Sequence, residues 1–140
     1  MLEIPLSGEA PRELAPSGLD QHSATFSPKR DQFAFVRLNQ IIVRDRRSGD
    51  ERVLATGDDF PAAVAPPGFT WLEYAPDGER ILFTCRGCEK SLTLWIVPLS
   101  GGAPAKVAGD GDGGYAGSWS PDGQWIVNSR TGAGSREYLK

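Results

Sequence analysis

Two cysteines separated by two residues have the spacing of a metal-binding or redox-active pair. The segment Cys85-Arg86-Gly87-Cys88 contains both cysteines of the 140-residue chain. A structural zinc site takes four ligands, and the one histidine, His22, lies far away in the sequence. Redox-active pairs are activated at the start of a helix, whereas this pair lies between two expected strands. We therefore expect a hairpin turn with two incidental thiols. A local disulfide bond and a metal ion shared across a dimer are the alternatives.

Acidic residues gather at two other places. Asp110–Gly114 reads Asp-Gly-Asp-Gly-Gly and is similar to part of a calcium loop. An EF-hand needs twelve residues that end in a bidentate glutamate between two helices, and strands are expected here. We interpret this segment as a loop between sheets, with a weak calcium site as the alternative. Asp58 and Asp59 precede Phe60 in a loop of residues 57–68 rich in Gly, Ala and Pro, where a solvated turn is expected.

No arrangement for catalysis is found in the sequence. The chain has no Gly-x-Ser-x-Gly elbow, and His22 has no recognisable serine or aspartate partner. No Gly-rich segment ends in the Lys-Ser or Lys-Thr pair that holds a nucleotide phosphate. We interpret His22 as a polar residue of a loop between sheets. The sequence therefore predicts a protein that is not an enzyme, with no catalytic, cofactor-binding or metal-binding residues.

Composition excludes several classes of partner. The formal net charge is −3, from 15 basic and 18 acidic residues. The chain therefore has no excess of positive charge that would attract nucleic acid or an anionic membrane. No apolar run approaches the ~20 residues needed to cross a bilayer. Residues 1–16 contain three glutamates and no apolar block, so they do not form a signal peptide. A periplasmic and a cytoplasmic location both remain open.

Two groups of surface candidates remain. Four arginines, at positions 44, 46, 47 and 52, alternate with Asp45, Asp50 and Glu51, and this pattern favours cross-strand ion pairs. An anionic partner is the alternative for these arginines. Among the four tryptophans, Trp125 is the best candidate for exposure, because the matching positions of the repeats described next hold Gln32 and Arg80.

The chain contains an internal repeat. Three segments, residues 24–35, 72–83 and 118–127, share an aromatic residue, a small residue, a proline, two polar or turn-forming residues and then an apolar strand. Their prolines lie 48 and 45 residues apart, close to the ~40–45 residues of a four-stranded propeller blade. The Pro-Asp-Gly step is turn chemistry, because proline fixes φ and glycine accepts a positive φ. Each segment therefore predicts two antiparallel strands.

A second element lies between these segments. Residues 5–11 and 98–104 share the run Pro-Leu-Ser-Gly-x-Ala-Pro, and residues 41–55 form a third copy without the prolines. Each repeat unit thus has an inner hairpin followed by an outer one. The middle strands, such as residues 81–83 and 94–97, are nearly continuous apolar runs, which is typical of sheets packed on both faces.

The predicted fold class is all-β, a β-propeller segment of about three four-stranded antiparallel blades. Residues 1–16 form an outer half blade, 22–56 a blade, 69–108 a blade and 115–140 an inner half blade. Closed propellers have four to eight blades, so three blade equivalents cannot close a ring. Either the chain is a piece of a longer propeller, or two copies pair about a two-fold axis into a homodimer with a six-bladed ring.

The segments Tyr74–Phe83 and Trp119–Val127 resemble the bacterial WD-like propeller repeat that is named for its Pro-Asp pair and is found in TolB-type proteins. Repeat one departs from this pattern, since Lys29 and Arg30 replace Asp-Gly, and we expect a different type of turn there. The resemblance implies a propeller used for binding or gating rather than for chemistry. In this family such repeats occur in TolB, in gates of prolyl oligopeptidase-like peptidases, and in regions of bacterial kinases and winged-helix regulators.

The function expected from the sequence is that of a scaffold or sensor. A protein or peptide partner would bind to the loops between blades, such as residues 57–68 and 109–117, because rigid blades present variable loops. The alternative is a gating or regulatory propeller portion of a larger enzyme, either a prolyl oligopeptidase-like peptidase or a bacterial Ser/Thr kinase, or of a winged-helix transcriptional regulator.

Overall fold

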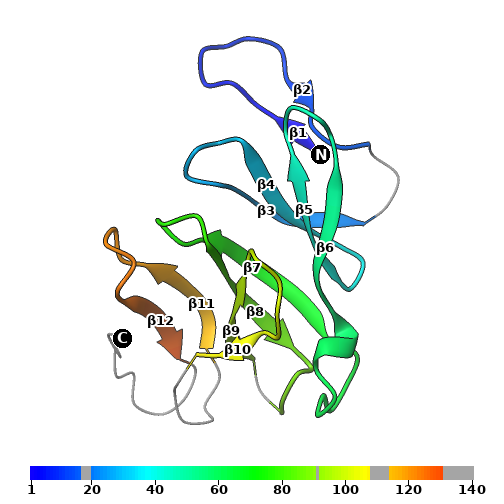
Figure 1. Ribbon diagram of the computed structural model, residues 1–140, viewed down its shortest axis with the longest axis vertical. Coiled ribbons are helices and arrows are strands. Elements are labelled where there is room, and N and C mark those ends of the chain that lie inside the picture. The colour runs from blue at the N-terminus through cyan, green and yellow to red at the C-terminus, as the bar shows by residue number, and fades with distance from the viewer. Residues whose placement is uncertain (17–19, 91, 108–113, 131–140) are drawn as a thin grey trace.

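Four antiparallel sheets follow one another along the chain (Figure 1). The structure, a computed structural model, describes residues 1–16, 20–90, 92–107 and 114–130. Within each sheet, strands that are neighbours in space are also consecutive in the chain. This meander is the arrangement that short turns between antiparallel strands produce.

Two complete blades lie between two half blades. The N-terminal half blade comprises β1 (Leu2–Glu3) and β2 (Arg12–Glu13). Blade 1 comprises β3 (Gln21–Phe26), β4 (Gln32–Arg37), β5 (Gln40–Asp45) and β6 (Glu51–Thr56). Blade 2 comprises β7 (Gly68–Tyr74), β8 (Arg80–Arg86), β9 (Thr93–Pro98) and β10 (Ala105–Lys106). The C-terminal half blade comprises β11 (Gly114–Trp119) and β12 (Ile126–Arg130).

The predicted all-β fold with two full and two half blades is confirmed. Among the described residues the one helical element is a single 3-10 turn, η1 (Gly57–Asp59), which follows blade 1. Residues 131–140, which the prediction assigned to the C-terminal half blade, lie outside the described part of the chain.

The middle strands of each complete blade are apolar on both faces. Successive side chains of a strand point to opposite faces, so an unbroken apolar run requires packing partners on both sides. In blade 1 the face toward the N-terminal half blade carries Phe33, Phe35 and Ile42, and the face toward blade 2 carries Ala34, Val36, Ile41 and Val43. All seven side chains are buried. Stacking of sheets therefore accounts for the poor alternation of the sequence.

Three core clusters correspond to the three contacts between successive sheets. The largest lies between blades 1 and 2, where Phe60 from the connection inserts its ring against Phe69, Phe83 and Trp95. A fully buried Phe83 contributes on the order of 2 kcal/mol relative to an exposed one. Tyr74 belongs to this cluster, and burial of its hydroxyl raises the pKa of Tyr74 to about 12.

The Pro-Asp-Gly turns of repeats two and three have the same geometry. The amide of Gly78 donates to Ala75 O and that of Gly123 to Ser120 O, both at 2.9 Å. Both glycines have a positive φ, 74° for Gly78 and 69° for Gly123. The carboxylate of Asp77 accepts the backbone amide two residues later, and this hydrogen bond lowers the pKa of Asp77.

The expectation of a different turn in repeat one is wrong. The amide of Arg30 donates to Ser27 O at 2.8 Å, and Arg30 takes the glycine position with a φ of 59°. Hydrogen bonds around Ser27 fix this turn, since its amide donates to Gln32 O and its hydroxyl accepts from Gln32 N. The Arg30 guanidinium also lies 5.5 Å from the centre of the Phe26 ring. The closing interactions thus impose a left-handed conformation on a residue other than glycine.

We predict that Gly123→Ala lowers the free energy of unfolding by about 1 kcal/mol, because a left-handed φ is costly for a residue with a Cβ. A steric clash does not contribute to this loss, since the nearest atom to an added Cβ is Pro76 Cδ at 3.6 Å. Urea denaturation followed by tryptophan fluorescence measures the difference. Gln124→Ala, at the next exposed position of the turn, is the control and should change the free energy by a few tenths of that amount. Equal stability of Gly123→Ala and the unmodified chain would contradict the turn assignment.

Candidate functional site

A cleft of about 810 Å³ opens between blade 1 and blade 2. Its walls come from the start of β3, the β4–β5 hairpin, the start of β7, the end of β8 and the residue before β9. The lining residues are Asp20, His22, Leu38, Asn39, Gln40, Gly68, Phe69, Thr70, Arg86 and Leu92. Because these residues come from separate segments and form no motif, sequence reasoning could not predict the cleft.

The chemistry of the cleft is mixed. Leu38 is exposed and Leu92 half-buried, so both offer apolar contacts, whereas the side chain of Phe69 is buried in the core. Arg86 is exposed and forms no ion pair within the described part of the chain. Asp20 supplies a carboxylate and Asn39 an amide. A few polar groups around apolar side chains are typical of a site that binds a ligand.

A strained hairpin residue forms one rim. Leu38 has a φ of 55° and its side chain is 59% exposed. Its amide donates to Asp20 O at 3.2 Å, which ties the hairpin to the chain just before β3. A bulky residue in the left-handed region carries a conformational cost, and such positions concentrate at functional sites. This exposed leucine is therefore a candidate ligand contact.

His22 lies in β3 and not in a loop, which corrects the expectation from the sequence. Its Nδ1 is 3.0 Å from the hydroxyl of Ser23, the neighbouring residue. The Ser23 hydroxyl also accepts a hydrogen bond from the amide of Trp71 in β7, at 3.3 Å. Ser23 therefore links the innermost strands of the two blades.

The innermost strands share an irregularity that exposes one side chain. The pairing of β3 with β4 shifts register between His22 and Thr25, and that of β7 with β8 shifts between Thr70 and Glu73. Within the second shift Trp71 has a φ of 54° and is 61% exposed. This exposure is not readable from the sequence, because a β-bulge reorients the side chain without a fixed sequence signal. Trp125, the tryptophan predicted to be exposed, is 50% exposed.

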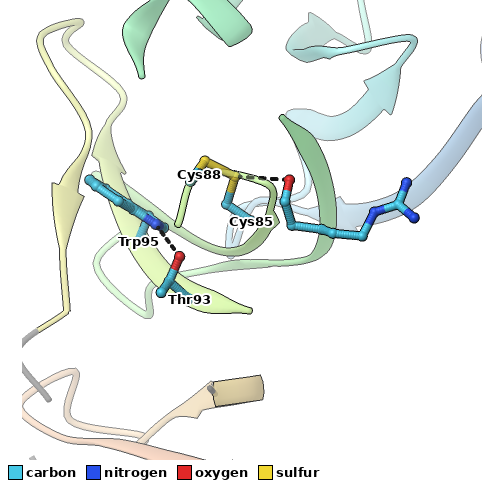
Figure 2. The surroundings of a disulfide bond; sticks show 5 residues. Cys85, Cys88, Thr93 and Trp95 are labelled. Atoms are coloured by element: carbon cyan, nitrogen blue, oxygen red, sulfur yellow. Dashed lines mark hydrogen bonds between the residues drawn. A yellow bond between two sulfur atoms is a disulfide. The ribbon is translucent and has the colours of Figure 1, made fainter. Parts of the chain in front are cut away.

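Cys85 and Cys88 form a disulfide bond with their Cα atoms 5.8 Å apart (Figure 2). Both are buried, and neither is free to bind a metal ion. The expectation of two incidental thiols is therefore wrong, and the alternative of a local disulfide is the one found. Gly87 explains this geometry, because its φ of 90° turns the backbone between the two cysteines. The Cα atoms of Cys85 and Cys88 therefore lie within disulfide range.

The disulfide loop holds the connection between the blades. Gly87 O accepts the amides of Val64 at 2.9 Å and Ala65 at 3.3 Å. A Cβ on Gly87 would lie 2.8 Å from Pro66 O, so this approach requires glycine. Residues 57–68 are thus fixed beside Arg86, at the edge of the cleft.

The remaining acidic candidates have structural roles or lie outside the described ranges. Asp59 accepts the amide of Thr56 at 2.7 Å, and the Thr56 hydroxyl accepts the amide of Asp58 at 3.2 Å, which together cap η1. Asp58 and Asp59 are both exposed, as in a solvated turn. Residues 110–113 of the Asp110–Gly114 segment lie outside the described residues. The described ranges contain no group of three or more His, Cys, Asp or Glu that could hold a metal ion.

The predicted cross-strand ion pairing of the arginine cluster is confirmed for Arg44. Arg44 pairs with Glu51 across β5 and β6 at 2.8 Å, and Arg37 of β4 reaches the same carboxylate at 2.6 Å. The hydrogen bond from Arg37 is the main reason why the pKa of Glu51 is lowered. Arg46 instead contacts Glu3 of the N-terminal half blade at 2.7 Å. These arginines therefore join strands and sheets.

Comparison with solved structures identifies the fold. The chain superimposes on a protein assigned as TolB from Agrobacterium tumefaciens with a TM-score of 0.71 and 22% sequence identity, over 93% of this chain and 45% of that one. The chain has a TolB-type propeller fold. A TolB from Acinetobacter baumannii gives a TM-score of 0.44 and 18% identity, over 96% of this chain and 43% of that one. The chain thus spans less than half the length of either protein.

No family model and no curated protein matches the chain, so the TolB-type likeness is one of structure. The WD-like repeat proposed from the sequence is supported at the level of this fold. Among the described residues of this TolB-type propeller, no helix is long and apolar enough to span a membrane.

We predict that replacing both cysteines with alanine lowers the free energy of unfolding by about 2 kcal/mol, because a link across so short a loop removes little entropy from the unfolded chain. Hydrogen exchange should also accelerate at Val64 and Ala65, whose acceptor Gly87 is no longer held. Urea denaturation and exchange followed by mass spectrometry measure the two effects.

The control is a reducing agent, which should destabilise the unmodified chain and leave the double alanine variant unchanged. Detection of two free thiols by a thiol reagent in the unreduced protein would contradict the disulfide assignment.

Proposed function

We propose that this TolB-type propeller segment is a non-catalytic scaffold that binds a peptide segment of a partner protein in the cleft between blades 1 and 2. The observation that carries this proposal is the combination in one cleft of three side chains: Arg86, which forms no ion pair with another described residue, the exposed Leu38 and the half-buried Leu92. An extended peptide offers the matching carboxylates, amides and apolar side chains.

The arrangement of the cleft supports binding more than chemistry. Ser23 is the hydroxyl beside His22, and its oxygen already accepts the amide of Trp71. His22 and Ser23 are neighbours in one strand. A serine nucleophile and its histidine base also need a third group that orients the histidine. The likeness to TolB structures concerns the fold, and nothing in it favours a peptidase, a kinase or a winged-helix regulator.

The charge in the cleft indicates the kind of peptide. An arginine without a carboxylate partner gains a charge-assisted hydrogen bond when a ligand carboxylate approaches, and planar guanidinium groups favour carboxylates in a bidentate geometry. Leu38 lines the same cleft and offers an apolar contact at its rim. We therefore expect an acidic side chain or a chain-terminal carboxylate next to an apolar residue in the bound peptide.

The loop between blades 1 and 2 borders the cleft. Residues 57–68 end at Gly68, which lines the cleft, and they are hydrogen-bonded to Gly87, the neighbour of Arg86. Val64 in this loop is 61% exposed. The loop would extend the contact surface beyond the cleft, because its backbone is fixed while its side chains are free.

Selection from a phage library of random 12-residue peptides on the immobilised chain tests the proposal. Enriched peptides should contain Asp, Glu or a free C-terminus, and Arg86→Ala should weaken their binding about tenfold or more in fluorescence polarisation, in line with the loss of one charge-assisted bond. Leu38→Ala should weaken binding by a smaller factor.

Arg47→Ala is the matched control, because Arg47 is exposed and lies outside the cleft. Its binding should equal that of the unmodified chain. Peptides that bind Arg86→Ala and the unmodified chain equally well, or a selection without enrichment, would overturn the cleft as the binding site.

A further inference from the structure

Trp71 is an exposed tryptophan on a backbone that is held in place. It lies within the register shift of β7 and is 61% exposed. Its backbone amide donates to the Ser23 hydroxyl of blade 1 at 3.3 Å, and this hydrogen bond fixes the bulge against the neighbouring blade. The indole therefore offers an aromatic surface that a ligand can reach without disturbing the core.

The bulge itself does not require tryptophan. The repeat aligns Trp71 with Ser23, which lies in the matching register shift of β3. Ser23 has nearly the same left-handed conformation, with a φ of 56° against 54° for Trp71. A serine thus suffices for this backbone, and a large side chain that stays mostly in water adds little to the core. The remaining role of the indole is contact with another molecule, for which tryptophan is the residue most enriched at binding hot spots.

Glu73 places a negative charge two residues further along β7. Its Oε1 accepts the hydroxyl of Ser118 at 3.1 Å and the amide of Trp119 at 3.2 Å. Both donors are neutral, so they position the carboxylate without compensating its charge. Glu73 is half-buried and forms no ion pair with another described residue. Alternate residues of a strand lie about 7 Å apart, so one long ligand side chain can contact both the indole and this carboxylate.

We propose that Trp71 and Glu73 bind the charged group of a lysine or arginine side chain of the partner peptide. A cation is attracted to the face of an aromatic ring, most strongly to that of tryptophan. The carboxylate adds a charge-assisted hydrogen bond. An apolar side chain would satisfy the indole and leave Glu73 without a counter-charge. These two residues are called the cation site below.

The cation site continues the cleft along the same strand. Gly68, Phe69 and Thr70 line the cleft. Trp71 is the next residue of β7. The Arg86 guanidinium lies at the other end of this run, since an added Cβ on Gly68 would be 3.6 Å from Arg86 Nη2. Three residues of a strand span about 10 Å, so a positive group and the cation site lie about that far apart.

This separation specifies the partner peptide. An extended peptide also rises about 3.3 Å per residue, so the acidic residue bound by Arg86 lies about three residues from the basic residue bound at the cation site. The inference rests on the proposed function for the acidic contact, and it adds a basic residue and a spacing to the peptide.

Nuclear magnetic resonance tests the cation site without the cleft. The probe is acetyl-lysine amide, and the signal is the indole N–H of Trp71, identified by its loss in Trp71→Ser. We expect this signal to shift on titration, because the bound ammonium group lies against the indole. Acetyl-norleucine amide, which lacks the charged group, should leave the signal unmoved. Glu73→Gln keeps an acceptor for Ser118 and Trp119 and should weaken probe binding about threefold or more.

Synthetic peptides test the spacing. Each peptide carries fluorescein and contains one Asp and one Lys among alanines and serines, and the peptides differ in the order of these two residues and in the number of residues between them. Fluorescence polarisation should show the tightest binding with about two intervening residues. Trp71→Ser should weaken that binding about fivefold and should not change the binding of a peptide with norleucine in place of the lysine.

Trp125→Ser is the matched control, because Trp125 is 50% exposed and lies next to β12, outside the cleft and the cation site. This variant should bind the probe and the peptides as the unmodified chain does. Circular dichroism should show the same spectrum for all three variants, since each changes a side chain outside the buried core.

An unmoved Trp71 signal, an equal shift with acetyl-norleucine amide, or peptide binding that is independent of spacing would overturn the cation site. If Arg86→Ala weakens peptide binding while the Trp71 signal stays unmoved, the cleft stands and the cation site is refuted. If acetyl-lysine amide shifts the signal while Arg86→Ala leaves peptide binding unchanged, the cation site stands and the cleft is refuted.

Discussion

The packing of apolar sheets on both of their faces is the interaction on which the rest of the structure depends. The side chains of β4, β5, β8 and β9 alternate between two neighbouring sheets, and each contact between sheets has its own core cluster. Gly117 of β11 shows how close this packing is, because an added Cβ would lie 3.0 Å from Leu82 and 3.1 Å from Leu94. A single four-stranded sheet of this sequence would leave both of its apolar faces in water.

Polar contacts then fix how neighbouring sheets are placed. At the innermost strands Ser23 accepts the amide of Trp71, and Glu73 accepts both the hydroxyl of Ser118 and the amide of Trp119. At the outer side Arg46 reaches Glu3. Each contact joins one sheet to the next, and the hydrogen bond from Trp71 to Ser23 is the one that links blades 1 and 2, which border the cleft.

The repeat carries most of the information about the fold, and little about the cleft. The spacing of Pro28, Pro76 and Pro121 and the apolar middle strands predict the blades because turn chemistry and burial act locally. The left-handed Arg30 and the bulge at Trp71 are set by hydrogen bonds across strands, which a local pattern does not contain. The disulfide depends on how Gly87 turns, so the Cys-x-x-Cys spacing alone could not decide among turn, disulfide and metal site.

Hydrogen exchange resolved to individual amides tests most directly whether both faces of the middle strands are buried. The account predicts that the paired amides of β4, β5, β8 and β9 exchange most slowly, through global unfolding, while the exposed turn at Lys29 exchanges rapidly. Amides of β8 that exchange as rapidly as that turn would show that blade 2 is not enclosed between its neighbours, and would contradict the stacked arrangement.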